Sequence, residues 1–414
     1  MKKILIISYY FPPCVGIAPN RPAAFANDFS KFHDVKVVTR HWLGNENKWE
    51  DYLKSNPSKE ERIQQNKYLE IIQVPYQSKV QKPNTLKTFF DLLRGKLDPE
   101  IDATQLLPAA SEIAANWKPD LILVSTPPIN LVQVAYLLHK KFKIPFIVDF
   151  RDFENDTLLN KNKKLRKWDN PVFQFREFHV IRWLKKSSAI ATINTELQSY
   201  FIRKTQKETA LVFNGFENSL FDQFVPLQEL RSDRFIISIV GTIYQGQEYE
   251  LFLEAFQKVL PGRPEILFKF IGTDTIPEIG DQVKAALPEE NLFVTQKIPR
   301  KEALKHLEES HLVWHPEWKG YVGMYSGKIF EYLGAKRHIL IAPSVGDVID
   351  QLLQETNSGK SFRTSEEIAA FIREKYDEWK TNGVIRYDGN NEAIAFYSRE
   401  NQSRRLLDVI EKYS

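Results

Sequence analysis

The sequence predicts an α/β protein with two doubly wound, parallel-sheet domains. Short runs rich in Val and Ile recur along the 414 residues, and they are too apolar for the half-exposed strands of an antiparallel sheet. Helical segments separate these runs, which is the alternation typical of doubly wound folds. Because the length exceeds what one hydrophobic core usually serves, we expect two domains.

The first series of strands and helices fills about half of the chain. Its predicted strands cover residues 4–8, 35–39, 69–74, 121–125, 146–150 and 189–193. Its predicted helices cover residues 22–32, 108–117, 131–142 and 172–186. We expect residues 1–212 to form an amino-terminal Rossmann-like domain.

A second series begins after a short strand at 210–213 and the turn signal Asn214-Gly215. Its predicted strands cover residues 236–240, 266–271, 292–295, 311–315 and 338–342. Its predicted helices cover residues 248–260, 278–287, 300–309, 327–333, 347–354 and 365–379. We expect residues 213–391 to form a second Rossmann-like domain that faces the first across a cleft. A last helical segment, 392–414, has no strand after it and is free to cap either domain.

Composition narrows the class of protein. Hydrophobic residues make up 43% and charged residues 27%, which is an ordinary globular balance. The net charge of +4 is too small to favour nucleic-acid binding, and no reader motif appears. The apolar run after Met1 is too short for a signal-peptide core, and Cys14 is the single cysteine, so we expect a cytoplasmic protein without disulfides.

The positive charge is unevenly distributed. Residues 161–167 hold five basic side chains, and residues 173–186 continue with phenylalanine, tryptophan and further basic residues. This mixture suits a helix on a membrane surface, where rings enter the headgroup zone and lysines meet anionic lipid. A helix packed on its own domain with a solvated basic end is an equally good interpretation. Membrane contact and packing on their own domain are also the two interpretations of residues 79–96.

The strongest chemical signal is a glycine-rich loop before a predicted helix. Gly320, Gly323 and Gly327 let the backbone bend so that successive amides can face one anion. Ser326 is the predicted N-cap of the helix. A phosphate is favoured at such a helix start, and Lys328 adds a positive charge in the first turn.

Glu331 lies one turn further along the same helix. Its carboxylate offers the acceptor oxygens that a ribose diol requires, and phosphate together with ribose indicates a nucleotide. A surface loop followed by an ordinary amphipathic helix remains the alternative. The phosphate loop of nucleoside triphosphatases is excluded, because only three residues separate Gly323 from Gly327 and Ile329 follows Lys328.

Two other glycine turns follow predicted strands. Gly241 and Thr242 come directly after the strand at 236–240 and could meet the same phosphates, although a tight turn explains the glycine equally well. Gly16 follows the first strand and would let the backbone approach a ligand from the first domain.

Polar residues also end two neighbouring strands of the first domain. Asp149, Arg151 and Asp152 lie at the end of one, and Ser125 and Thr126 end the strand before it. Charged groups at strand ends in a crevice are often binding or catalytic groups. The alternative is that Arg151 forms a structural ion pair with a neighbouring acid. We expect Asp149, Ser125 and Thr126 on the acceptor side of the cleft.

No metal site or cofactor is predicted. His311 and His315 lie four residues apart on a predicted strand, which separates them by about 13 Å, too far for one ion. Packing is the simpler role for both.

Taken together, the motifs resemble the GT-B glycosyltransferases of family 4, which are retaining enzymes that use nucleotide sugars. The resemblance spans almost the whole chain and rests on ILIISYYFPP at 4–13, VDFRD at 148–152, FNGF at 213–216, GTIY at 241–244 and SGKIFEYL at 326–333. It implies a donor held by the second domain, an acceptor held by the first, and a terminal helix that returns to the first domain. It also implies retention of configuration, no metal requirement, and a carbohydrate or lipid-linked acceptor. Bacterial surface polysaccharide or glycoconjugate synthesis, at the inner face of the plasma membrane, would be the setting.

The resemblance assigns roles to individual residues. Glu331 matches the glutamate that holds the nucleotide ribose. The amides that match the diphosphate loop belong to Met324, Tyr325, Ser326 and Gly327.

The sequence departs from the family pattern at two places. Gly323 stands where many members carry a glutamate that touches the transferred sugar. Gln245 and Gln247 stand in the region where many carry an arginine and a lysine for the diphosphate. We therefore expect Lys328 to supply that charge.

The implied mechanism uses few groups. Lys328 and the loop amides would stabilise the departing diphosphate. Asp152 or the departing phosphate would take the proton of the acceptor hydroxyl, and Arg151 would orient Asp152 or the acceptor. A nucleotide-sugar epimerase of the same fold and a non-catalytic partner subunit remain alternatives.

Overall fold

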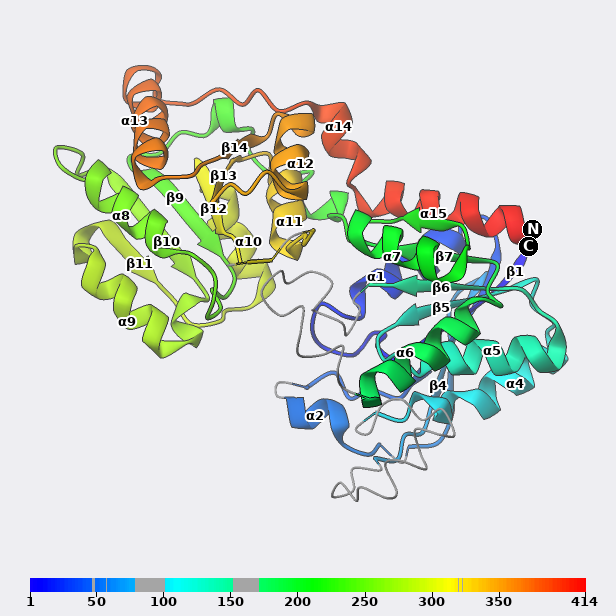
Figure 1. Ribbon diagram of the computed structural model, residues 1–414. Coiled ribbons are helices and arrows are strands. Elements are labelled where there is room, and N and C mark those ends of the chain that lie inside the picture. The colour runs from blue at the N-terminus through cyan, green and yellow to red at the C-terminus, as the bar shows by residue number, and fades with distance from the viewer. Residues whose placement is uncertain (47–48, 57, 79–100, 152–170, 319, 322) are drawn as a thin grey trace. The chain divides into compact units, whose positions relative to one another are not determined.

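A computed structural model describes residues 1–46, 49–56, 58–78, 101–151, 171–318, 320–321 and 323–414 (Figure 1). The chain divides into two compact units. Unit 1 comprises Met1–Asn214 and Arg399–Ser414, and unit 2 comprises Gly215–Ser398. Within the described ranges, no helix combines the length and the apolar character that crossing a membrane requires.

Unit 1 is built on an eight-stranded sheet in the order β3-β4-β2-β1-β5-β6-β7-β8. All neighbouring strands are parallel except β3 and β4, and the strands that the sequence predicted are present. Their bounds are β1 (Lys3–Ser8), β2 (Asp34–Arg40), β3 (Glu61–Asn66), β4 (Leu69–Val74), β5 (Leu121–Thr126), β6 (Phe146–Phe150), β7 (Ala189–Thr192) and β8 (Thr209–Leu211). β1, β5 and β6 are buried almost throughout, as expected for parallel strands covered on both faces.

The edge strand β3 was not predicted and makes the sheet mixed. Its sequence, ERIQQN, is almost entirely polar, and all six residues are exposed. It pairs antiparallel with β4 through the backbone, and the side-chain amide of Gln64 adds a hydrogen bond to the carbonyl oxygen of Leu69. Because an edge strand can be held by backbone hydrogen bonds without burying side chains, hydrophobic patterning carries no sign of it.

Helices cover both faces of this sheet (Figure 1). α1 and α15 pack on one face through residues such as Phe25, Phe29 and Leu406. α4, α5 and α6 pack on the other through residues such as Ala110, Leu131 and Trp183. The bounds are α1 (Asn20–Phe29), α2 (Trp49–Leu53), α4 (Leu107–Asn116), α5 (Leu131–Phe142), α6 (Pro171–Leu184), α7 (Thr195–Thr205) and α15 (Arg399–Tyr413). Unit 1 is therefore doubly wound, as predicted.

The predicted terminal helix at 392–414 is in fact two helices in different units. α14 (Asn391–Phe396) lies in unit 2, whereas α15 lies in unit 1. The helical segment is interrupted at Tyr397. The carbonyl oxygen of Tyr397 accepts a hydrogen bond from the amide of Phe216, 3.1 Å away. This contact between distant parts of the chain ends α14, so the expected return to the first domain applies to α15 alone.

Unit 2 contains a six-stranded, parallel sheet in the order β11-β10-β9-β12-β13-β14. The strands are β9 (Phe235–Val240), β10 (Ile266–Ile271), β11 (Leu292–Val294), β12 (Leu312–Pro316), β13 (His338–Ala342) and β14 (Gly359–Ser361). The helices are α8 (Glu250–Val259), α9 (Pro277–Ala286), α10 (Arg300–Glu308), α11 (Gly327–Ala335), α12 (Val348–Thr356) and α13 (Ser365–Asn382). β14 was not predicted, because three polar or small residues give no pattern; a Cβ at Gly359 would collide with the backbone of Ile339.

A buried ion pair holds unit 1 together where the chain leaves it. Arg21 of α1 binds Asp149 of β6 in a bidentate manner, with Nη2 2.6 Å from Oδ1 and Nε 2.9 Å from Oδ2. Arg21 is 4% and Asp149 0% exposed. The same guanidinium donates to the carbonyl oxygens of Val212 and Phe213, just after β8. One side chain thus connects the first helix, a central strand and the last segment of unit 1 before Gly215.

We expect Arg21→Met to lower the free energy of unfolding by about 3–5 kcal/mol, because it leaves a carboxylate buried without its partner. Urea denaturation measures the change. Lys31→Met is the control, since Lys31 pairs with Asp28 at the surface, and it should cost less than about 1 kcal/mol. Equal effects of the two substitutions would contradict the role given to the buried pair.

Candidate functional site

Several loops of unit 2 leave the same edge of its sheet. The strands are parallel, so the segments that follow β9, β12 and β13 all lie at their carboxyl ends. The glycine-rich loop and the start of α11 follow β12, and Gly241-Thr242 follows β9. Two stretches predicted to share one ligand are therefore on one edge of one sheet.

Lys328 links these two stretches directly. α11 begins at Gly327, and the side chain of Ser326 accepts a hydrogen bond from the amide of Lys328, which confirms the predicted N-cap. The ammonium of Lys328 donates to the carbonyl oxygen of Thr242 at 2.5 Å. It also lies 6.0 Å from the centre of the Tyr244 ring.

Gly241 provides the room that Lys328 needs. Its φ is +107°, and a Cβ at this position would lie 2.7 Å from Cε of Lys328. The amide of Gly241 donates to the carbonyl oxygen of Ile271, so the turn is fixed against β10. A side chain at 241 would displace the lysine, which gives this glycine a reason beyond the tight turn that the sequence indicated.

The charge of Lys328 is not matched by an acidic side chain of the described residues. Burial lowers the pKa of Lys328 to about 8, and nearby Glu331 only partly opposes this shift. Within the described ranges, no carboxylate lies within ion-pair distance of the ammonium. The amides of Met324 and Gly327 likewise find no acceptor in the part of the chain that the structure describes. A cation and amides beside a helix start with neutral or no protein partners suit an anionic ligand.

Glu331 has a partner that the sequence did not indicate. Nη2 of Arg300 lies 2.9 Å from Oε1 of Glu331. Both side chains are partly exposed, at 43% and 30%, so the pair is accessible to a ligand. Arg300 is the first residue of α10, and nothing in the local sequence links it to Glu331.

An acidic group next to the glycine loop was also missed. Glu317 directly follows β12, and burial raises its pKa to about 8, with Asp347 and Asp350 adding to the shift. Its Oε1 finds no hydrogen-bond partner among the described residues and lies 3.8 Å from Nε2 of His315. His315 is buried, which lowers its pKa well below the usual value, and Lys328 adds to this effect. His315 therefore lies at the edge of the site, in addition to packing.

Gly323 stands where the resemblance would place a glutamate. The backbone of this glycine is bound by a different acidic residue, Asp347. The φ of Gly323 is +72°, and its amide donates to Oδ2 of Asp347 at 2.5 Å. Asp347 is the N-cap of α12 and forms a capping box with Asp350. A carboxylate is thus present beside position 323, although it comes from the loop after β13.

Two other residues of this edge have structural roles. Gln247 is buried; its Nε2 donates to the carbonyl oxygen of Pro316, and its Oε1 accepts from the amide of Tyr244. It anchors the loop after β9, so it does not take the place of a charged diphosphate contact. Tyr325 packs its ring 5.7 Å from the ring of Phe330.

The predicted acceptor residues of unit 1 lie in a different environment from the one expected. Asp149 is fully buried, and besides Arg21 it accepts a hydrogen bond from Oγ of Ser125 at 3.0 Å. Oγ1 of Thr126 donates to the backbone carbonyl oxygen of Asp149. All three are buried and hydrogen-bonded within unit 1, and a carboxylate without exposure needs donors such as Ser125 and Arg21. They are therefore structural groups and are not presented to an acceptor.

Three further residues of unit 1 were predicted to belong to the site, and the structure describes two of them. Arg151 lies half-buried directly after β6. Asp152 lies outside the described residues. Gly16, with φ of +120°, approaches the hydroxyl of Tyr52, which donates to the carbonyl oxygen of Val15. This turn therefore lies beside α2 and the loop after β2.

The described residues contain no group of three or more histidine, cysteine, aspartate or glutamate side chains placed to hold a metal ion. His311 has the packing role that was expected, since it is buried and its Nδ1 accepts from the amide of Ile236 at 3.0 Å. Burial lowers its pKa to about 3.

Two parallel-sheet α/β units in series give the chain the GT-B fold. No protein-family model matches the sequence, and no curated protein matches it either. The comparison with solved structures does find chains of similar fold.

The chain is similar to Anabaena HepE in complex with UDP, with a TM-score of 0.63 and 13% identity, covering 99% of this chain and 100% of that one. It is similar to sucrose-phosphate synthase from Thermosynechococcus elongatus, with a TM-score of 0.63 and 12% identity, covering 100% and 99%. It is also similar to the UDP-GlcNAc 2-epimerase of Neisseria meningitidis bound to UDP-GlcNAc, with a TM-score of 0.57 and 12% identity, covering 99% and 100%. At identities this low, the similarity shows the shared fold alone.

Proposed function

We propose that this protein is a glycosyltransferase that moves a sugar from a nucleotide-sugar donor to a carbohydrate or lipid-linked acceptor. The observation that carries the proposal is the ammonium of Lys328. It lies at the start of α11, bonded to a neutral carbonyl oxygen and without an acid partner in the described ranges. A nucleoside diphosphate would supply the missing negative charge.

In this proposal, unit 2 binds the donor. Lys328 and the amides of Met324 to Gly327 contact the diphosphate, and Thr242 positions the lysine. Glu331 accepts hydrogen bonds from the ribose hydroxyls while Arg300 binds its Oε1. UDP is the first nucleotide to test, because HepE and the Neisseria epimerase are described with UDP or a UDP-sugar.

The chemistry follows from where charge develops. When the bond between sugar and phosphate breaks, negative charge grows on the diphosphate, so a fixed ammonium and amides stabilise the transition state more than the bound donor. This arrangement favours a reaction without a metal ion. We propose retention of configuration, with the departing phosphate or Asp152 taking the acceptor proton and Arg151 orienting it. A role in bacterial surface polysaccharide or glycoconjugate synthesis is part of the same proposal.

An epimerase is the second candidate, and similarity to the Neisseria enzyme favours it. The two activities differ in their need for an acceptor. A transferase releases nucleotide and glycosylated acceptor together, whereas an epimerase converts the donor sugar with no acceptor present. A non-catalytic subunit would do neither.

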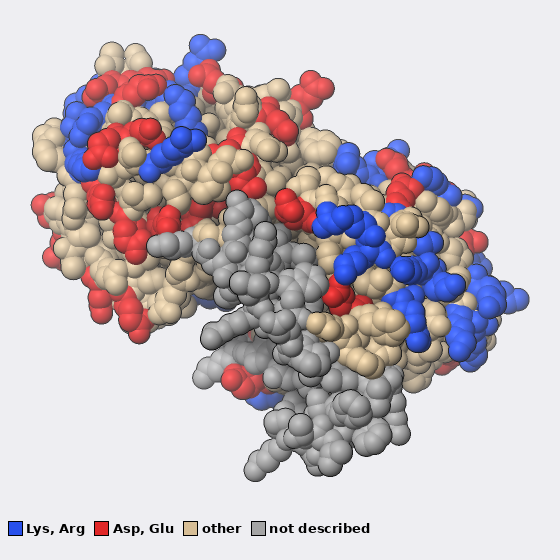
Figure 2. All heavy atoms as spheres, in the orientation of Figure 1, with Lys and Arg blue, Asp and Glu red and all other residues tan. Residues whose placement is uncertain are grey.

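We further propose contact with the inner face of the plasma membrane through α6. Phe175 and Phe178 of this helix are exposed, at 38% and 59%. Arg182, Lys185 and Lys186 are exposed near its end. Figure 2 shows lysine and arginine side chains gathered over the face of unit 1 that carries α6 and α7. The basic segment 161–167 and the segment 79–96 lie outside the described residues.

Affinity for UDP should fall as the pH rises through about 8 and above, because the ammonium of Lys328 loses its proton there. The charged form exists below that pKa, so binding is strongest at pH 7. Bound diphosphate favours the charged form, which moves the fall to higher pH. Isothermal titration calorimetry from pH 7 to pH 10 measures it.

Lys328→Gln is the matched control for this pH dependence. It should bind UDP about 10–100-fold more weakly at pH 7, as expected for a lost hydrogen bond from a charged group. Its affinity should then be nearly constant over the same range. A pH profile parallel to that of the unaltered protein would contradict the role of Lys328.

The role of Glu331 can be tested by removing either the carboxylate or the ribose hydroxyls. The unaltered protein should prefer UDP over 2′,3′-dideoxy-UDP by about tenfold or more, since the carboxylate accepts charge-assisted hydrogen bonds. Glu331→Ala should lose this preference while keeping its melting temperature within a few degrees. If the variant discriminates between the two nucleotides as before, Glu331 does not hold the ribose.

For the membrane proposal, co-sedimentation with vesicles containing anionic phospholipid should show binding at low salt that weakens at high salt. Phe175→Ser combined with Phe178→Ser should reduce it severalfold. Phe293→Ser is the control, because Phe293 is an exposed phenylalanine of unit 2. Absence of binding at both salt concentrations would end this proposal.

A further inference from the structure

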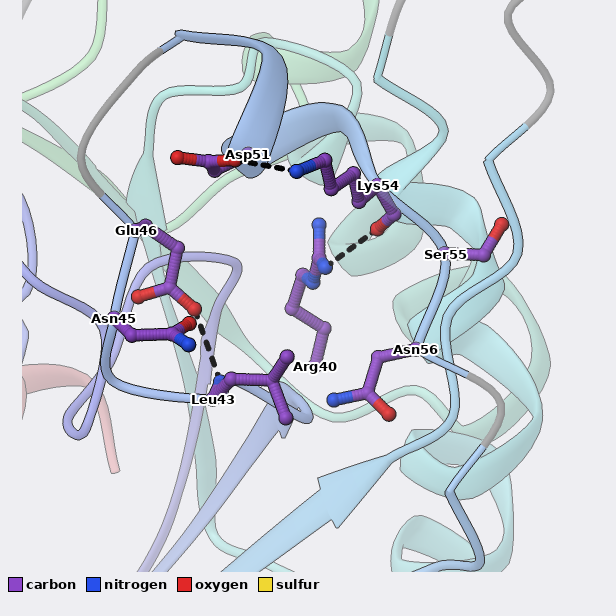
Figure 3. Close-up of a pocket in the computed structure, with 8 residues that line it drawn as sticks. All are labelled: Arg40, Leu43, Asn45, Glu46, Asp51, Lys54, Ser55 and Asn56. Carbon is purple, nitrogen blue, oxygen red and sulfur yellow. Dashed lines mark hydrogen bonds and ion pairs between the residues drawn. The ribbon is translucent and has the colours of Figure 1, made fainter.

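A pocket lies wholly within unit 1, after the carboxyl end of β2. It encloses about 170 Å³, and eight residues line it (Figure 3). The side chain of Arg40, the last residue of β2, points into its centre, with Asp51 and Lys54 on one side and Asn56 on another. None of these residues was singled out by the sequence.

Arg40 is buried, and no acidic side chain of the described residues pairs with it. It is 3% exposed, and within the described ranges its guanidinium donates to neutral oxygens. These are the hydroxyl of Tyr9 at 2.6 Å and the carbonyl oxygens of Tyr52 at 2.8 Å, Lys54 at 2.9 Å and His41 at 3.5 Å. No ion pair to Arg40 exists among the described residues.

Aromatic rings surround the same guanidinium. Its central carbon lies 3.9 Å from the ring centre of Trp42 and 4.1 Å from that of Tyr76. Tyr9, Trp42 and Tyr76 follow β1, β2 and β4, which are neighbours in the sheet. The topology thus collects the rings around Arg40, and they stabilise its position without supplying a negative charge.

The two acids of the pocket are committed elsewhere. Glu46 is buried and accepts three backbone amides from its own loop and the loop after β1. Asp51 pairs with Lys54, at 2.6 Å. The charge of Arg40 is therefore the unmatched one, and burying a lone cation is costly unless an anion offsets it.

The volume limits what the pocket can hold. About 170 Å³ corresponds to roughly five or six water molecules at about 30 Å³ each. Pockets for whole drug-sized ligands measure about 300–1,000 Å³. A single phosphate or carboxylate group fits, whereas a nucleotide does not.

One residue of the pocket lining, Leu43, is apolar, and it is 67% exposed. Val15 of the loop after β1, which contacts the lining residue Glu46, is 38% exposed. The amide of Val15 donates to Glu46, which connects the two loops. Exposed aliphatic side chains beside a buried cation suit a ligand that carries an apolar portion next to its anionic group.

We propose that this pocket binds the phosphate or carboxylate group of an amphiphilic acceptor, with its apolar portion against Leu43 and Val15. That this ligand is the acceptor of a sugar rests on the proposed glycosyl transfer. The binding itself does not, because it involves unit 1 alone and needs no nucleotide sugar.

The test is a titration of the full chain with hexyl phosphate, followed by ligand-observed NMR, with inorganic phosphate, glucuronate and hexanol as comparison probes. Hexyl phosphate should bind more tightly than inorganic phosphate and glucuronate, and hexanol should not bind. Equal affinities for hexyl phosphate and inorganic phosphate would overturn the amphiphilic part. Tightest binding of glucuronate would overturn it in favour of an acidic sugar.

Charge variants locate the binding in this pocket. Leu43→Asp should weaken hexyl phosphate about three- to tenfold relative to Leu43→Asn, which has the same shape and no charge, because a negative charge at the rim repels the anion. Asp51→Asn should strengthen binding by a similar factor, a gain that misfolding cannot produce. Absence of hexyl phosphate binding, or variants without effect, would overturn the proposal even if nucleotide-sugar turnover is observed. Loss of all turnover with these effects intact would instead count against the proposed function.

Discussion

Unit 1 depends on the buried pair of Arg21 and Asp149. A carboxylate with no exposure in a parallel sheet is stable only with a cation against it, and Arg21 provides that cation from α1. Because the same guanidinium also holds the carbonyl oxygens of Val212 and Phe213, the pair fixes the point where the chain leaves the unit. The amide of Phe213 donates to Gln402 of α15, so the returning helix is tied to the same segment.

Two cations at or beyond the carboxyl ends of strands, half-buried Lys328 and buried Arg40, differ from Arg21 in one respect. Lys328 in unit 2 and Arg40 in unit 1 are bonded to neutral oxygens, and neither forms an ion pair within the described ranges. A matched buried charge stabilises a fold, whereas an unmatched one beside open space is suited to a ligand. This distinction separates the structural role of Asp149 from the binding roles proposed for the two cations.

Much of the fold and part of the site could be predicted from local sequence. Apolar runs located the buried strands, Ser326 was placed as the N-cap, and the glycine loop was placed beside Lys328. The polar edge strand β3 and the short β14 were missed because neither buries enough to leave a pattern. The sequence placed Asp149, Ser125 and Thr126 at the correct strand ends but did not predict their burial. The local sequence around an acid at a strand end is the same whether or not an arginine from a distant helix pairs with it.

The sequence by itself determined the alternation of strands and helices, the helix start at Gly327 and the candidate anion loop. These depend on residues within a few positions of one another. Only the tertiary structure decided that Gly241 makes room for Lys328, that Arg300 pairs with Glu331, and that rings following three neighbouring strands surround Arg40. Such pairings depend on which strands lie side by side, and strand order is a property of the whole chain that no short segment carries.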